Sequence, residues 1–150
     1  MLQGMVPHRK RLGYFLAVAC MLIAGCSEKK YKTYPVTGVV KFEDGSVAKA
    51  GRVEFYSREY DLTARATISA DGTFVIGTET AHDGAVEGEH QVLIMQMVWP
   101  SQTGVTVHDH GAHIDESYAS FRSSGLTFHV EAKRDNFAEF VVRKQKKRRR

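Results

Sequence analysis

Two Asp-Gly pairs constrain the fold of this chain more than any other local feature. Asp44-Gly45 and Asp71-Gly72 lie less than 30 residues apart. Asp and Gly tolerate the positive φ that a tight hairpin turn requires. Before the first pair, residues 36–43 alternate between apolar and polar types, which is the period of a strand with one buried face. These signals together predict antiparallel β-structure.

Seven short segments carry strand patterns, with turn signals between them. Four consecutive apolar residues, Val92 to Met95, are typical of a strand that is covered on both faces. The pattern therefore predicts an all-β fold, an antiparallel seven-stranded β-sandwich. The strands are expected at residues 36–43, 52–57, 62–69, 74–77, 90–98, 125–132 and 137–142.

A short apolar run near the N-terminus ends in Ile23-Ala24-Gly25-Cys26. A basic group, His8-Arg9-Lys10-Arg11, precedes the 13-residue apolar run Leu12–Ala24, and this order resembles a bacterial lipoprotein signal peptide. A transmembrane helix needs about 20 apolar residues. The pattern thus favours a signal helix over residues 1–25 that is cleaved, with lipid attached at Cys26. An uncleaved membrane anchor and a buried helix of a cytosolic protein are the alternatives.

Processing at Cys26 would leave 125 residues, which suits one domain with a real core. We expect a tether over residues 26–33, a sandwich domain over 34–142 and a disordered basic tail over 143–150. Cys20 leaves with the signal and Cys26 carries lipid, so no intramolecular disulfide is expected. The expected location is the cell envelope, with lipid holding the exported chain to a membrane whose leaflet the pattern leaves open.

Charge is divided unevenly along the chain. Residues 31–142 hold 9 Lys or Arg against 16 Asp or Glu, a net charge of −7, whereas residues 143–150 hold seven cations and no acid. The tail lacks aromatic residues that would stack on bases, so we expect no nucleic acid partner. Anionic lipid, an envelope polymer or the acidic face of its own domain is the expected partner, and a merely solubilising tail is the alternative. Its cations are Arg143, Lys144, Lys146, Lys147, Arg148, Arg149 and Arg150.

Residues 99–123 form a long connection rich in Pro, Gly, Ser and His, with a short helix expected around residues 115–121. His108, His110 and His113 place three imidazoles close together, which suits Zn or Cu. A solvated polar loop and a shared response to pH below about 6.5 are the other interpretations.

Nothing in the pattern predicts a catalytic site. Ser123 or Ser124 with His129 and Asp135 would supply a triad on paper, but no nucleophile elbow accompanies them. The aromatics of Trp99-Pro100 and of residues 56–60 leave carbohydrate binding as a weaker hypothesis.

Six short segments together resemble a known family, the planctomycete-type small lipoproteins with a carboxypeptidase regulatory-like, transthyretin-like domain. The resemblance covers residues 34–142 and implies a non-enzymatic lipid-anchored module of the cell envelope, for interaction or structural support, whose protein partner is unknown. Two departures are Ser46-Val47, where the family usually has Pro, and His90, where it has an aromatic residue. The segments are Tyr34–Val40, Asp44-Gly45, Arg52–Phe55, Asp71–Phe74, Gly88–Val92 and Ser124–Thr127.

Overall fold

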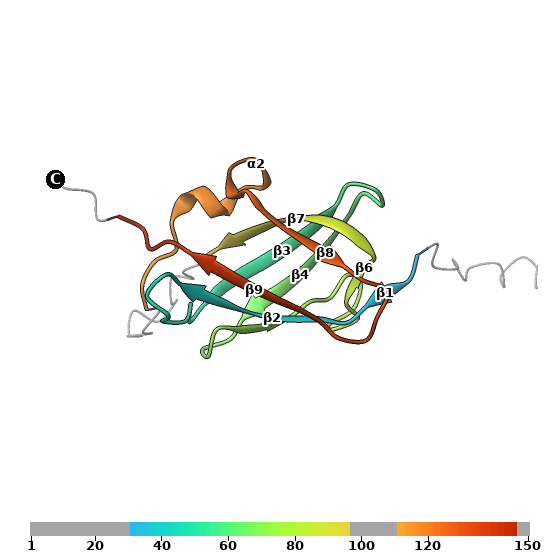
Figure 1. The fold of residues 1–150 in the computed structure, drawn as a ribbon, viewed down its shortest axis with the longest axis horizontal. Helices are drawn as coiled ribbons and strands as arrows, with labels where there is room; N and C mark the ends of the chain where they lie inside the picture. Colours follow the sequence, from blue (N-terminus) through green and yellow to red (C-terminus); the bar gives the residue numbers. More distant parts are fainter. Residues whose placement is uncertain (1–30, 97–110, 147–150) are drawn as a thin grey trace, which may run out of the picture. The chain divides into compact units, whose positions relative to one another are not determined.

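The computed structural model describes residues 31–96 and 111–146, and the chain divides into two units, Met1–Lys30 and Tyr31–Arg150. All described elements belong to the second unit, which is an all-β fold with two short helical turns (Figure 1). The elements are β1 Thr33–Tyr34, β2 Val36–Phe42, β3 Gly51–Ser57, β4 Leu62–Ile68, β5 Thr73–Val75, β6 Ala85–Val86, β7 Gly88–Met95, the 3₁₀ turn η2 Glu116–Ala119, α2 Phe121–Ser124, β8 Leu126–Val130 and β9 Asn136–Val142.

Two main sheets enclose the core. One is four-stranded and antiparallel throughout, with the order β4-β3-β7-β8. The other has the order β5-β2-β9, and β2 pairs antiparallel with β5 but parallel with β9. A small pair, β1-β6, lies at the end where the chain enters β2 (Figure 1).

The parallel pairing of β2 with β9 corrects the expectation of an entirely antiparallel sandwich. The register runs from Val36 opposite Asn136 to Phe42 opposite Val142. Parallel neighbours need a long connection rather than a tight turn, and here the whole four-stranded sheet lies between them in sequence. Both strands therefore begin at one end of the sheet and finish at the other.

Each of the seven expected strand segments overlaps a strand, but the described residues form nine strands rather than seven. The additional strands are β1 and β6, in which Thr33 pairs with Val86 and Tyr34 with Ala85. Two residues are too few to show a period-two pattern, so sequence reasoning missed them. The expected signal helix over residues 1–25 lies outside the described residues.

Asp44-Gly45 and Asp71-Gly72 form turns, as expected. Gly45 and Gly72 have φ of 82°, and each aspartate accepts a hydrogen bond from a backbone N–H two residues on, Asp44 from Ser46 at 3.1 Å and Asp71 from Thr73 at 3.0 Å. The second turn does more than close a hairpin. It carries the chain from β4 in one sheet to β5 in the other.

Aromatic rings from both sheets meet around Phe55 in the centre of the core. The Phe55 centroid lies 5.6 Å from Phe128, 5.9 Å from Phe140 and 6.3 Å from Phe74. His90 stands where the resemblance leads one to expect an aromatic residue, and its ring packs 5.9 Å from Phe55 with only 2% of the residue exposed. The imidazole thus fills the place of an apolar ring.

Strand β7 is covered on both faces, as its apolar run indicated. Val92 and Ile94 belong to the core, and Leu93 on the other face is also buried. The short turns η2 and α2 both contact this strand. The short helix expected around residues 115–121 is confirmed by these two turns. Residues 97–110 of the long connection lie outside the described residues.

Candidate functional site

The basic C-terminal segment begins as ordered chain rather than as a loose tail. After β9, the Arg143 carbonyl accepts a hydrogen bond from the Asp115 N–H at 3.0 Å, and the Gln145 N–H donates to the His113 carbonyl at 2.8 Å. Between them Ile114, which is buried, forms a β-bridge with Lys144. Residues 143–146 are therefore docked on the segment that precedes η2, whereas the sequence predicted disorder from residue 143.

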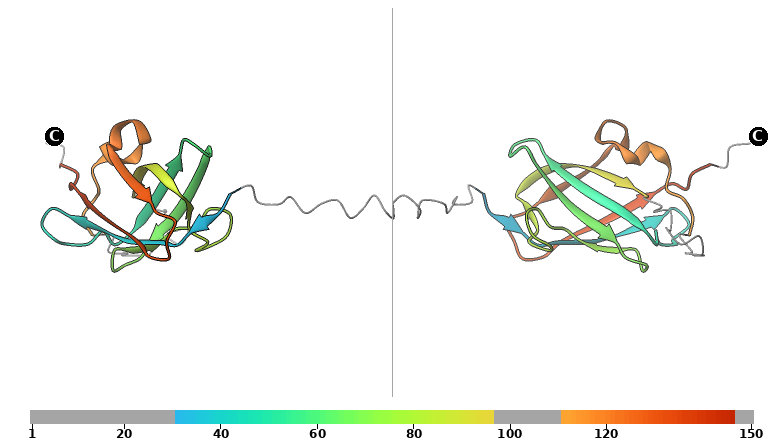
Figure 2. Two further views of the ribbon diagram at one scale, coloured as in Figure 1. Left: turned by 45° about the vertical axis from the view of Figure 1, so that its right-hand side comes forward. Right: turned by 180° about the vertical axis from the view of Figure 1, so that it is seen from behind.

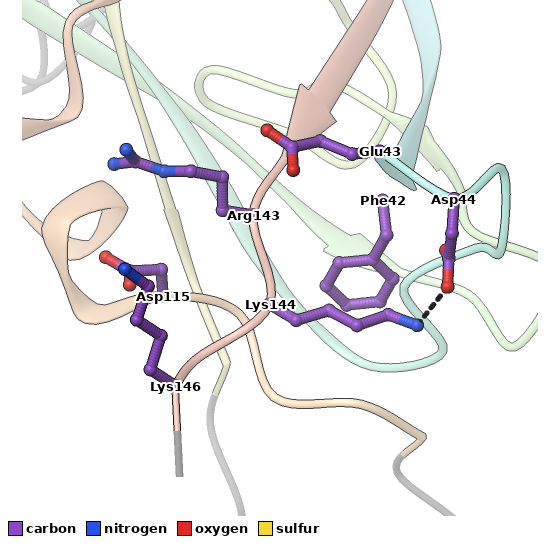
Figure 3. A pocket seen from close by; sticks show the side chains of 7 residues that line it. All are labelled: Phe42, Glu43, Asp44, Asp115, Arg143, Lys144 and Lys146. Atoms are coloured by element: carbon purple, nitrogen blue, oxygen red, sulfur yellow. Dashed lines mark hydrogen bonds and ion pairs between the residues drawn. The ribbon is translucent and has the colours of Figure 1, made fainter. Parts of the chain in front are cut away.

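Side chains strengthen this docking. Lys144 is ion-paired with Asp44 of the first Asp-Gly turn, and its ammonium lies 5.2 Å from the Phe42 ring centroid (Figure 3). The Arg143 guanidinium lies 5.6 Å from the Tyr118 ring centroid and donates to Ser117 Oγ at 3.2 Å. A cation over an aromatic face is stabilised by the ring quadrupole. The first cations of the segment thus hold the chain end to the domain.

A hollow of about 390 Å³ opens between the β2 end and this segment (Figure 3). Three of its lining side chains are acids and three are cations, so the hollow carries no net formal charge. Its lining residues are Phe42, Glu43, Asp44, Asp115, Arg143, Lys144 and Lys146.

The electrostatics of the hollow follow from hydrogen bonds between its own groups. The Lys144 ammonium, followed by the Ser46 hydroxyl and N–H, holds the pKa of Asp44 well below its usual range. The Ser117 hydroxyl and N–H lower the pKa of Asp115, and Arg143 and Lys146 add smaller contributions. Both carboxylates stay ionised at any physiological pH and neutralise neighbouring cations. Lys147, Arg148, Arg149 and Arg150 lie outside the described residues.

The fold separates the basic segment from the start of the domain. Because β2 and β9 are parallel and in register, residues 31–35 precede the pair at one end and residues 143–146 follow it at the other. Seven residues of strand at about 3.3 Å per residue separate the two ends by about 20 Å. All three ribbon views show this separation (Figures 1 and 2).

The histidine cluster is described only in part. His108 and His110 lie outside the described residues, and His113 is exposed beside Ile114. Within residues 31–96 and 111–146, no group of three or more His, Cys, Asp or Glu is arranged to hold a metal ion. The Zn or Cu site therefore stays a prediction.

Ser124 and His129, considered above as members of a catalytic triad, both have structural partners. Ser124 Oγ donates to the Val92 carbonyl, and His129 Nδ1 pairs with Glu89 at 2.9 Å on the exposed face. Of the aromatics considered for sugar stacking, Tyr56 donates its hydroxyl to Asp61 at 2.9 Å and packs its ring 5.6 Å from Phe121. Trp99 lies outside the described residues.

The sequence predicted the acidic face of the domain as one partner of the basic segment, and the ion pair of Lys144 with Asp44 is a contact of this kind, but the sequence did not identify the residues. The sequence pattern predicts a turn at Asp44 and the start of a short helix at Asp115, and no local pattern links residue 44 to residue 144. The parallel register of β2 and β9 brings them together. In the described part of the chain, no helix has the length and apolar character to cross a membrane. The run Leu12–Ala24 lies outside that part.

No protein-family model matches the chain, and no curated protein matches it in sequence. Among solved structures, the chain is similar to a DUF3823 family protein from Parabacteroides merdae, with a TM-score of 0.42 and 13% sequence identity. The similarity covers 77% of this chain and 48% of that protein, so the chain spans about half of its length.

Proposed function

We propose that this chain is a lipid-anchored module of the cell envelope that catalyses no reaction. In this proposal it is an exported lipoprotein with a transthyretin-like, carboxypeptidase regulatory-like sandwich, attached to a membrane through Cys26. The lipobox pattern and the resemblance of residues 34–142 to planctomycete-type small lipoproteins support it. The basic segment at the far end of the sandwich is the part that meets a partner.

The observation that carries this proposal is the placement of the tether and the basic segment at opposite ends of the sheet. Cys26 is five residues from Tyr31, a reach of at most about 17 Å. The basic segment starts about 20 Å beyond the tether end. Attraction to anionic lipid falls off within a Debye length of about 8 Å at physiological salt. With the tether end toward the membrane, the segment points away from the anchoring bilayer.

This geometry favours an anionic envelope polymer over the anchoring lipid as the partner. The three acids of the hollow, Glu43, Asp44 and Asp115, balance the three cations of residues 143–146, so the positive charge in excess comes from the four residues 147–150. Clusters of cationic side chains bind polyanions chiefly through charge and counterion release. The predicted interaction is consequently sensitive to salt.

Lipid attachment is tested first, by labelling cells that express the full chain with a clickable fatty acid. The proposal predicts label on the wild type and none on Cys26→Ser. Label absent from both, with the intact chain in the cytosol, would overturn it.

The partner is tested with the lipidated protein in neutral phosphatidylcholine vesicles. Capture of soluble dextran sulfate should fall at least tenfold when Lys147, Arg148, Arg149 and Arg150 become Gln, and capture should weaken as salt rises. The matched control replaces Lys133 and Arg134, a basic pair in the β8–β9 turn, with Gln. Equal loss in the control, or no loss in the tail variant, would contradict the assignment.

A further inference from the structure

A second hollow lies at the joint between β4 and β5, along the opposite edge of the β5-β2-β9 sheet from the basic segment. Its volume is about 440 Å³, and none of its lining residues is an acid. Its polar side chains come from Arg52, Arg65, Thr67, Ser69, Thr73 and His82. The wall therefore combines two guanidiniums with three hydroxyl groups, and of these the Thr73 hydroxyl donates to Asp71, which lies outside the wall, at 2.7 Å.

The backbone of β4 frames this hollow. Arg65 exchanges hydrogen bonds with Gly77, at 2.7 and 3.0 Å, and the Ser69 N–H donates to the Thr73 carbonyl at 2.9 Å. Successive residues of a strand direct their N–H and C=O to alternate sides. Thr67 lies between these two pairs of bonded residues. Its N–H and C=O therefore point to the same side of β4 as the backbone groups of Arg65 and Ser69. The sheet edge thus offers a backbone donor in the gap between them.

The carboxylate of Glu54 forms ion pairs with both guanidiniums. Glu54 Oε1 lies 3.5 Å from Arg52 Nη1 and 3.4 Å from Arg65 Nε, and the Glu54 side chain is only 13% exposed. The arginine side chains are 40% and 56% exposed, so their other N–H groups reach solvent. Glu54 is largely buried and is shared by the two cations, and a second acid, Asp71, lies next to the wall, where it accepts hydrogen bonds from the N–H and hydroxyl of Thr73 at 3.0 and 2.7 Å. The solvent-facing N–H groups of the two arginines are therefore the charged donors open to a ligand.

We propose that this hollow is an oxyanion-binding site, which takes a phosphate or sulfate group either as a free ion or as an ester on a polymer. Guanidiniums match these tetrahedral groups with forked N–H donors. Arg52 and Arg65 supply those donors, the Thr67 N–H adds a backbone donor, and Glu54 holds the two arginines side by side. This site is independent of the lipid anchor and of the basic segment.

The test is calorimetric titration of the full chain with sodium phosphate, sodium sulfate and heparin. All proteins carry Gln at residues 147–150, so that the four cations in excess at the chain end contribute nothing. Arg52→Gln and Arg65→Gln should each weaken binding about tenfold, the loss expected for one charge-assisted hydrogen bond. Glu54→Gln should tighten it severalfold, because the competing anion is gone. The control is Arg58→Gln, an exposed arginine of the β3–β4 turn outside the hollow.

Comparison of the three probes also shows whether the phosphate or sulfate group is bound as a free ion or as an ester on a polymer. Binding of free phosphate or sulfate that both arginine variants weaken supports a free-ion site, and binding of heparin alone with the same losses supports a polymer ester. Thermal unfolding of each variant shows that it remains folded. The proposal is overturned if the wild type binds none of the three probes, or if Arg58→Gln weakens binding as much as the pocket variants.

Discussion

Gly38 gives the sharpest test of how β2 packs against β9. It lies in the central strand of the β5-β2-β9 sheet, opposite Ala138 on one side and Phe74 on the other. A Cβ at this position would lie 2.3 Å from the Ala138 carbonyl oxygen and 2.3 Å from Phe74 Cζ. Both separations are about 1 Å shorter than ordinary van der Waals contacts, which start near 3.4 Å. Gly38→Ala therefore forces movement of both a ring and a backbone strand.

The expected cost is about 3 kcal/mol, the upper end of the range for an overpacked core, because the carbonyl belongs to the neighbouring strand. Alanine also lowers the conformational entropy of the unfolded chain, which offsets about 0.5 kcal/mol of this cost. Urea unfolding followed by circular dichroism should show the midpoint lowered by roughly 1–2 M. Adding Phe74→Leu should recover only part of the loss, since the carbonyl clash remains.

Gly45→Ala is the matched control, because nothing lies within 4 Å of the new Cβ and only the φ of 82° is strained. Its cost should be about 1 kcal/mol. A loss below about 1 kcal/mol for Gly38→Ala would refute the close parallel packing of β2 on β9.

Three further predictions concern individual side chains. Burial lowers the pKa of His90, so the folded state resists its protonation, and stability should be full above about pH 6.5 and fall as pH drops toward the folded pKa. His90→Phe should reduce the change of the urea unfolding midpoint between pH 7 and pH 5. The same change in the variant as in the wild type would contradict this reasoning. Ser57 Oγ is buried and has no hydrogen-bond partner among the described residues, so Ser57→Ala should stabilise the fold by about 1 kcal/mol in urea unfolding, whereas a loss would show that the hydroxyl is paired. Asp44→Asn removes the partner of Lys144, so limited trypsin digestion should cleave after Lys144 severalfold faster than in the wild type, and equal rates would argue against the docking of this segment.

The strands could be predicted from the sequence because each carries its own local signal. Alternation at residues 36–42, the Asp-Gly turns and the apolar run at Val92 to Met95 depend only on neighbouring residues. The direction of β9 beside β2 depends on contacts between residues 100 apart, and no local pattern encodes it. The mistaken antiparallel arrangement followed from extending hairpin logic to two strands that no hairpin joins.

The same difference between local signals and long-range contacts explains which parts of the candidate sites could be predicted. The cations of residues 143–150 were visible as a charge run, yet their carboxylate partners were not, because Asp44 and Asp115 approach them only through the tertiary fold. Arg52 and Arg65 lie on different strands and look like ordinary exposed positions of an alternating pattern. Only the pairing of β3 with β4 places them together around Glu54.

The most direct test of the central claim is the distance between the two ends of the domain. Spin labels on Lys32→Cys and Lys146→Cys, in a chain with Cys20 and Cys26 replaced by Ala, report it by pulsed electron resonance. The parallel register of β2 and β9 predicts a main distance above about 20 Å. A main distance below about 15 Å, which antiparallel pairing of the two strands would give, would place the basic segment beside the tether and contradict the account.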